Sequence, residues 1–353
     1  MSKASSSDCC GGTKLPAAVG RFGAIFAVLA WFGLAASAAS AAGFQYGTAP
    51  DPDDQPLELG IWYPSDALVS SQPLGLFTQQ VAPYGAIAAQ SLPLIVISHG
   101  TGGGAAGHYD TALALADAGF VVVTLTHTGD SYKDRAYSFT ARNFVDRPRH
   151  VSRVIDFMLN SWDGRDRLDP ARIGIFGHSA GGATALILLG GNPDLSLGVL
   201  FCRDHPDEWG CQRAKERAAG APSPPGGNAN PPDWHHDPRI KAAAIAAPAI
   251  GYTFTKDGLA AVTAPVQLWR AEDDRIAPNP WNGDIIKAAL PNPPDDHLVP
   301  KAGHFDFLAP CSEALAKIAP EICQSGPGFD RVAFHQQLNQ ALIEFFKARL
   351  AAP

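Results

Sequence analysis

From Leu57 onward, short apolar runs alternate with stretches of helical periodicity, and this alternation restricts the chain to few architectures. The run Phe120–His127 is continuous and β-branched, which is typical of a strand covered on both faces. Apolar residues recur at helical spacing in Val145–Trp162 and again in Val332–Leu350. Strands separated by helices favour a mostly parallel sheet with helices on both faces. The sequence therefore predicts an α/β fold, as a single domain over 42–353.

The other expected elements share the same alternation. Further strands are predicted at Leu57–Tyr63, Leu94–Ser98, Arg172–His178, Ile240–Ala247, Val266–Arg270 and His297–Val299, and further helices at Tyr109–Ala118 and Ala180–Leu189. Two stretches, 192–238 and 305–330, interrupt this rhythm, and the first contains a run rich in proline and glycine. We expect both to be loop excursions over one edge of the sheet rather than separate domains.

The N-terminal residues 1–41 are organised like a secretory signal peptide. Basic residues, the last of them Arg21, precede an apolar run over 22–34, and small residues with A-x-A cleavage patterns follow. An uncleaved membrane anchor is the alternative, since the run approaches the roughly 20 apolar residues that a span requires. The cleavage patterns favour a periplasmic or secreted chain with no membrane span after processing.

Charge and cysteine content agree with an exported protein that has no nucleic-acid partner. The formal net charge of the 353 residues is −7, whereas nucleic-acid-binding proteins usually carry a basic patch. Removal of a signal peptide leaves an even number of cysteines, which in an exported chain indicates disulfides. Short separations favour the pairs Cys202–Cys211 and Cys311–Cys323, and four free buried thiols are the alternative.

The pentapeptide Gly177-His178-Ser179-Ala180-Gly181 matches G-x-S-x-G between an expected strand and an expected helix, which is the context that this motif requires. A strand that turns abruptly into a helix holds the serine in a strained conformation, and the flanking glycines leave room for the turn. The serine hydroxyl is then presented at the carboxyl edge of the sheet, beside a helix N-terminus that favours negative charge. We predict that Ser179 is a nucleophile.

A serine nucleophile needs a base and an acid that orients the base, and in hydrolases with this motif the chain order is serine, acid, histidine. The strand Val266–Arg270 runs into a loop with three acidic residues, of which Asp274 is preferred and Asp273 is the main rival. His304 follows a glycine in a loop after the next strand, so it is the predicted base. The remaining histidines fit less well, including His235 and His236, which with Asp237 are interpreted as a solvated turn rather than a metal site.

The glycine-rich stretch after strand Leu94–Ser98 has two interpretations. Gly102, Gly104 and Gly107 match G-x-G-x-x-G, so the loop resembles a dinucleotide-binding turn. That interpretation needs an acidic residue for the ribose at the end of the next strand, where Asp130 fits only approximately. Alternatively, the loop supplies an N–H donor for the oxyanion of acyl transfer. We favour the oxyanion hole, formed by Thr101 (or its neighbour Gly102) together with Ala180, and we expect no cofactor.

With these residues placed, the chain from about Leu57 to Leu350 resembles the serine α/β-hydrolases. The segments "LPLIVISHGTGG", "RIGIFGHSAGG", "AEDDRIAP" and "AGHFDFLAPC" resemble the bacterial group called predicted dienelactone hydrolases, which is similar to platelet-activating-factor acetylhydrolases and, more distantly, to cutinases. The resemblance implies an α/β-hydrolase fold and cofactor-free hydrolysis of carboxylic esters. True dienelactone hydrolases use a cysteine nucleophile, whereas this chain has Ser179.

The function expected from the sequence is that of a serine carboxylic ester hydrolase with a Ser179–Asp274–His304 triad and an acyl-enzyme intermediate. Its substrate would be a small-molecule, lipid or polyester ester, and no metal is expected. A non-catalytic binding protein on the same fold is the second hypothesis, and a dinucleotide-binding oxidoreductase is the third.

Overall fold

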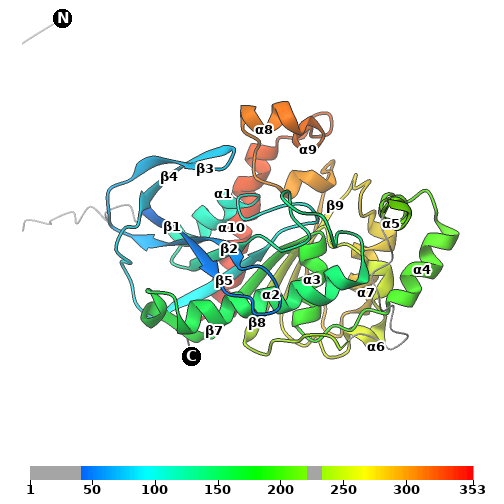
Figure 1. Ribbon diagram of the computed structural model, residues 1–353, viewed down its shortest axis with the longest axis horizontal. Coiled ribbons are helices and arrows are strands. Elements are labelled where there is room, and N and C mark those ends of the chain that lie inside the picture. Colours follow the sequence, from blue (N-terminus) through cyan, green and yellow to red (C-terminus); the bar gives the residue numbers. More distant parts are fainter. Residues whose placement is uncertain (1–40, 221–232, 353) are drawn as a thin grey trace, which may run out of the picture. The chain divides into compact units, whose positions relative to one another are not determined.

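A computed structural model describes residues 41–220 and 233–352 of the chain. The predicted signal peptide lies outside these residues apart from Ala41, with which the first strand begins. Ten strands form a sheet in the order β10-β9-β8-β7-β5-β6-β2-β1-β4-β3 (Figure 1). The strands are β1 (Ala41–Ala49), β2 (Leu57–Ser65), β3 (Ser70–Leu74), β4 (Phe77–Pro83), β5 (Leu92–Ser98), β6 (Val121–Leu125), β7 (Leu168–His178), β8 (Ile240–Ala246), β9 (Val266–Ala271) and β10 (Asp295–Val299).

The helices connect these strands and cover the sheet. They are α1 (Tyr109–Asp117), α2 (Ala141–Asn160), α3 (Ala180–Leu188), α4 (Leu195–Asp204), α5 (Trp209–Gly220), α6 (Lys256–Leu259), α7 (Gly283–Ala289), α8 (Glu313–Ile318), α9 (Pro320–Cys323) and α10 (Arg331–Arg349). Short 3-10 turns occur at η1 (Arg165–Arg167), η2 (Gly251–Thr253), η3 (Asn279–Trp281) and η4 (His304–Phe307). Among the described residues, no helix is both long and apolar enough to span a membrane.

The six strands from β6 across to β10 run parallel to their neighbours, as the alternation of strands and helices predicts. At the other end, β2 pairs antiparallel with both β6 and β1, and Figure 1 shows these blue and cyan strands together. Because the carboxyl ends of parallel strands meet at one edge, the loops that follow β5, β7, β9 and β10 gather there. This edge is where the sequence placed the functional residues.

Side chains alternate between two hydrophobic cores, one on each face of the sheet. Leu94 and Val96 of β5 belong to the core under α2 and α3, whereas Ile95 and Ile97 belong to the core under α1 and α10. All four side chains are buried. Burial on both faces explains why the parallel strands appear in the sequence as continuous apolar runs. The sheet therefore holds the carboxyl-edge loops on a rigid support.

Both predicted excursions contain helices as well as loops in their described residues, and the sequence interpretation did not predict these helices. The first contains α4 and α5, joined by the Cys202–Cys211 disulfide, whose Cα atoms lie 5.2 Å apart. The second contains α8 and α9, and the Cys311–Cys323 disulfide links this segment with a Cα separation of 5.7 Å. Both cysteine pairings agree with the prediction from short sequence separation.

A further correction concerns the turn that contains His235 and Asp237. It was expected to be solvated, but Asp237 is buried and accepts hydrogen bonds from Ser152 and Arg239. His235 also contacts the Ser152 hydroxyl, at 2.8 Å. The turn packs against α2 and immediately precedes β8.

Candidate active site

Ser179 occupies the sharp turn between β7 and α3. Its backbone angles are φ 56° and ψ −117°, a region that residues with a side chain rarely adopt. The chain is also tightly packed here, because a Cβ atom on Gly181 would lie 1.9 Å from the carbonyl oxygen of Ser98. A Cβ atom on Gly177 would lie 2.2 Å from the carbonyl oxygen of Gly181. The two glycines of G-x-S-x-G are therefore required by backbone contacts, and the serine itself carries conformational strain.

This strain can be measured by comparing two variants that both lack the hydroxyl. Strain of this kind costs about 1–3 kcal/mol, and glycine at a positive φ avoids it. Glycine also lowers the free energy of unfolding by about 0.4–1 kcal/mol relative to alanine, because it gives the unfolded chain more conformational entropy. We therefore expect Ser179→Gly to exceed Ser179→Ala in free energy of unfolding by about 1 kcal/mol, as measured by urea denaturation. Equal stability of the two variants would show that the turn is not strained.

The structure brings Ser179, His304 and Asp274 together, although they lie on three different loops. The Ser179 Oγ atom lies 2.9 Å from His304 Nε2, and His304 Nδ1 lies 2.8 Å from Asp274 Oδ2. The three residues are 7%, 4% and 7% exposed, respectively. With Nδ1–H donating to the carboxylate, Nε2 is left to accept the serine proton. Asp273, the rival acid, points to solvent and makes no such contact.

Asp274 is held in place by the main chain of its own loop. Its Oδ1 atom accepts hydrogen bonds from the N–H groups of Ile276, at 2.9 Å, and Ala277, at 2.7 Å. Burial alone raises the pKa of Asp274, but the charge and hydrogen bond of His304 and these two N–H groups lower the pKa further than burial raises it. The carboxylate is therefore ionised and correctly oriented toward the imidazole at neutral pH.

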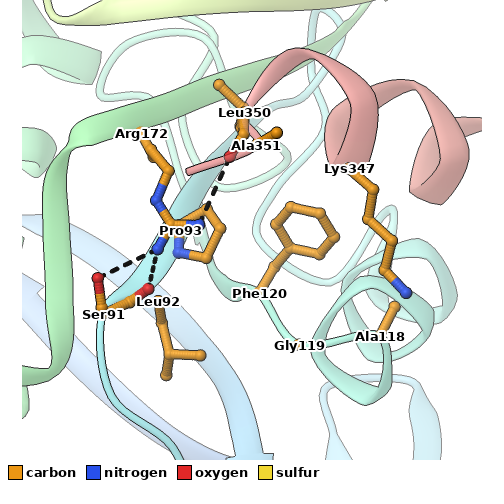
Figure 2. A pocket seen from close by; sticks show the side chains of 10 residues that line it. All are labelled: Ser91, Leu92, Pro93, Ala118, Gly119, Phe120, Arg172, Lys347, Leu350 and Ala351. Atoms are coloured by element: carbon orange, nitrogen blue, oxygen red, sulfur yellow. Dashed lines mark hydrogen bonds between the residues drawn. The ribbon is translucent and has the colours of Figure 1, made fainter. Parts of the chain in front are cut away.

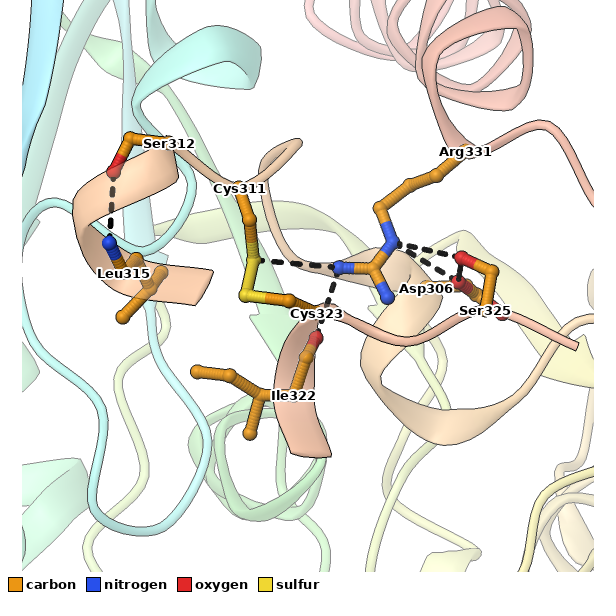
Figure 3. The surroundings of a disulfide bond; sticks show 8 residues. All are labelled: Asp306, Cys311, Ser312, Leu315, Ile322, Cys323, Ser325 and Arg331. Carbon is orange, nitrogen blue, oxygen red and sulfur yellow. Dashed lines mark hydrogen bonds and ion pairs between the residues drawn. A yellow bond between two sulfur atoms is a disulfide. The ribbon is translucent and has the colours of Figure 1, made fainter. Parts of the chain in front are cut away.

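His304 begins the turn η4, and that turn is anchored on its far side. Asp306 accepts a hydrogen bond from the N–H of Gly303, at 2.8 Å. It also forms an ion pair with Arg331 at the start of α10, with Nε and Oδ1 2.9 Å apart. Figure 3 shows the Arg331 guanidinium between Asp306 and the Cys311–Cys323 disulfide. The guanidinium also donates a hydrogen bond to the carbonyl oxygen of Ile322. The second disulfide-bonded segment thus braces the turn that carries His304.

His178 contacts the His304 loop from within the sheet. Its Nε2 atom donates to the carbonyl oxygen of His304, at 3.1 Å, and the two rings lie 4.9 Å apart. Burial holds the pKa of His178 well below its usual value, so the ring is neutral and can serve as a donor of this kind. In the sequence, His178 stands only as the variable residue of G-x-S-x-G. Its contact with a residue 126 positions away has no local signal.

The glycine-rich loop lies beside the serine, and its N–H groups differ in what they bind. The N–H of Gly102 donates to Asp130 Oδ1, at 3.3 Å. Neither the N–H of Thr101 nor that of Ala180 has a hydrogen-bond acceptor among the described residues. Asp130 is fully buried and forms an ion pair with Arg147. Its carboxylate is therefore bound by other groups of the protein and is not available to bind the ribose hydroxyl of a dinucleotide.

A cavity of about 600 Å³ lies between the α4–α5 connection and the loop that carries Asp274. Polar and apolar atoms contribute about equally to its lining, which consists of Asp204, His205, Pro206, Asp207, Glu208, Trp209, Gln212, Asp274, Arg275 and Pro278. Trp209 packs against Phe139 of the loop before α2, with ring centroids 5.4 Å apart, and Arg217 donates to the carbonyl of Ala136 in the same loop. Helix α5 therefore contacts the loop that follows β6, and it lines the cavity together with the loop that follows β9.

Another cavity, of about 250 Å³, lies at the opposite edge of the sheet, where β5 begins and α10 ends. Figure 2 shows Arg172 directed at Ser91, and the guanidinium donates to the carbonyl oxygens of Ser91 and Leu350. No residue of the Ser179 site lines this cavity. Its groups are engaged in structural contacts, so the carboxyl edge remains the candidate site.

The comparisons with known proteins agree with this fold. A family profile described as "Alpha/beta hydrolase family" matches residues 95–318. Among solved structures, the chain is similar to a puromycin-hydrolyzing peptidase of Mycobacterium tuberculosis, with a TM-score of 0.53 and 14% sequence identity. That match covers 88% of this chain and 40% of the peptidase chain, so the chain spans less than half the length of this relative. No curated protein matches the sequence.

Proposed function

Because the chain belongs to the alpha/beta hydrolase family, we propose that it is a hydrolase, and specifically a serine carboxylic ester hydrolase working through an acyl-enzyme. The observation that carries the proposal is the buried chain of hydrogen bonds from Ser179 Oγ through His304 to Asp274. A serine hydroxyl becomes nucleophilic when a neighbouring base accepts its proton, and a third group must orient that base. All three elements are present, and the turn between β7 and α3 directs the hydroxyl at His304.

In the first half of the reaction, His304 Nε2 accepts the proton of Ser179 as Oγ attacks the ester carbonyl carbon. Asp274 stabilises the imidazolium that forms. The tetrahedral oxyanion accepts hydrogen bonds from the N–H groups of Thr101 and Ala180, which are free for this purpose among the described residues. His304 then gives its proton to the departing alkoxide, so that an alcohol leaves and an acyl-serine remains.

In the second half, water replaces the alcohol. His304 removes a proton from water as its oxygen attacks the acyl carbon, and the same two N–H groups hold the second oxyanion. Collapse of this intermediate breaks the bond to Ser179 Oγ, which takes the proton back from His304. The products are a carboxylic acid and the free enzyme. No step needs a cofactor.

The cavity beside Asp274 favours a small or polar substrate over a long aliphatic chain. Its volume lies within the range of about 300–1,000 Å³ that is usual for ligand pockets. Its walls carry several charged side chains, among them Asp207, Glu208 and Arg275. A long alkyl chain lying against these groups would displace water from them without replacing its hydrogen bonds, which costs free energy. We propose that the enzyme acts on short or polar esters, and that the Cys202–Cys211 disulfide fixes one wall of this pocket.

A chain-length series of p-nitrophenyl esters tests this function and its substrate class together. An apolar pocket gains about 0.8 kcal/mol for each methylene that it buries, which is about a fourfold gain in kcat/KM. We expect turnover of the acetate and butyrate, and no such rise toward the octanoate. The matching p-nitroanilides report amide cleavage and should react far more slowly. Absence of ester turnover would refute the proposed activity, and a steady rise with chain length would refute the substrate class.

A further inference from the structure

Behind the glycine-rich loop lies an ion pair that the mechanism does not use. Arg147 Nη1 and Asp130 Oδ2 are 2.5 Å apart, and both side chains are 0% exposed. Asp130 also accepts hydrogen bonds from Ser138, at 2.5 Å, and from Asn143, at 2.8 Å. Burying two charges costs free energy that their mutual attraction often fails to recover, so stability alone is a weak reason for such a pair.

The pair holds the Thr101 segment from both sides. Arg147 Nη2 donates to the carbonyl oxygen of His99, and Asp130 Oδ1 accepts from the N–H of Gly102, at 3.3 Å. These two peptide groups lie immediately before and immediately after the peptide that carries the Thr101 N–H. With its neighbours fixed, the Thr101 peptide keeps its orientation without using its own N–H.

The same guanidinium also reaches the helix that carries the other donor. Arg147 Nε donates to Thr184 Oγ1, at 3.2 Å, and Thr184 Oγ1 donates to the carbonyl oxygen of Ala180, at 2.8 Å. One planar group therefore contacts the Thr101 loop through one nitrogen and α3 through another. Because the guanidinium is rigid, it fixes the distance between the two segments.

We propose that Arg147 and Asp130 are positioning residues that set the relative placement of the Thr101 and Ala180 N–H groups. This inference rests on the proposed ester hydrolysis, in which those two groups bind the oxyanion. The pair does not touch the substrate. It acts by keeping two main-chain donors aimed at one point before the substrate arrives, so that no reorganisation is needed during the reaction.

Arg147→Lys tests the proposal because it keeps the charge but loses the planar fork. Losing one oxyanion donor lowers kcat about 10²–10³-fold, and small misplacements of catalytic groups cost about 10²-fold. We expect kcat for p-nitrophenyl butyrate to fall about 100-fold with KM within about threefold of the wild type. The affinity for a trifluoromethyl ketone, which mimics the tetrahedral intermediate, should weaken by a similar factor.

One further variant keeps the test decisive if Arg147→Lys folds poorly, and a second serves as its control. Thr184→Val removes only the hydroxyl that links Arg147 to Ala180, and we expect it to lower kcat and ketone affinity together, by about tenfold. Arg239→Lys is the matched control, since Arg239 forms an ion pair with Asp237 at 2.6 Å, away from the site. It should leave both quantities within about twofold.

The outcomes separate this inference from the proposed function. A wild-type enzyme without ester turnover would overturn the proposed function, and the inference with it. An active wild type whose Thr184→Val variant retains its kcat and ketone affinity would overturn the inference alone. A lowered kcat with unchanged ketone affinity in Arg147→Lys would also overturn it, because the loss would then not arise at the oxyanion.

Discussion

Replacement of Ser179 by alanine is expected to lower kcat/KM for p-nitrophenyl butyrate by about 10⁶-fold. The hydroxyl lies 2.9 Å from His304 Nε2, and no other side chain in this arrangement can form the acyl intermediate. Only the N–H donors and substrate binding would remain, and these alone accelerate hydrolysis about 10³–10⁴-fold over water. The measurement is single-turnover and steady-state hydrolysis, with circular dichroism to confirm that the variant is folded.

The control for this prediction is Ser152→Ala. Ser152 is also a buried serine, but its hydroxyl contacts Asp237, at 2.7 Å, in the turn before β8. It should lose stability, since Asp237 loses a hydrogen bond, and keep its kcat. If Ser179→Ala retained more than a few per cent of the wild-type rate, Ser179 would not be the nucleophile.

The second large effect is expected at the acid. Asp274→Asn should lower kcat about 10⁴-fold, because an asparagine would turn an N–H donor toward His304 Nδ1. The imidazole would then carry its proton on Nε2, where it cannot accept the proton of Ser179. The geometry would otherwise survive, since the amide oxygen can still accept from the N–H groups of Ile276 and Ala277. Steady-state kinetics on the same ester measure the loss.

Asp273→Asn is the matched comparison for that variant. Asp273 is the neighbouring residue and carries the same functional group, but its side chain is exposed. We expect its kcat to stay within about threefold of the wild type. The opposite ranking, with the greater loss at residue 273, would mean that the loop rearranges and that the observed hydrogen bond to His304 is not the one used in catalysis.

The parts of the site that depend on local chain geometry could be predicted from the sequence. G-x-S-x-G between a strand and a helix located Ser179 because the sharp turn needs glycines on both sides of the serine: Gly177 lies against the backbone of Gly181, and Gly181 lies against the backbone of Ser98. The order of the acid and the histidine followed from the parallel sheet, whose strands deliver successive loops to one edge. Asp274 was preferred to Asp273 because of the short turn that follows it. In the structure, two N–H groups of that turn donate hydrogen bonds to Asp274.

The parts of the site that depend on long-range contacts could not be predicted from the sequence. Arg147 stands on the core-facing side of α2, in phase with Val151 and Val154, where a charged residue conflicts with the apolar pattern. That conflict indicates a buried, negatively charged partner for Arg147. The partner is Asp130, 17 positions away in the chain, which was considered above only as a possible ribose ligand. Nothing local indicates that one guanidinium joins two loops.

Strands β1, β3 and β4 and the helices of the two disulfide-linked segments were not predicted, for a different reason. Strand β3 reads "SSQPL", with one buried residue, so pairing with β4 rather than a hydrophobic face defines it. Helix α5 begins at Trp209, and four of its first nine residues are charged. Its position depends on the Cys202–Cys211 link and on the contact between Trp209 and Phe139. Such elements have weak periodicity, and their structure comes from partners elsewhere in the chain.

The most direct test of the account is covalent labelling with a fluorophosphonate, followed by peptide mass spectrometry. Such a reagent phosphonylates a serine only when a neighbouring base removes the proton from its hydroxyl, so it reports activation and not merely exposure. We expect one phosphonyl group per chain, located on Ser179, and labelling at least about 100-fold slower in Asp274→Asn. An unlabelled protein, or a label on a different residue, would contradict it.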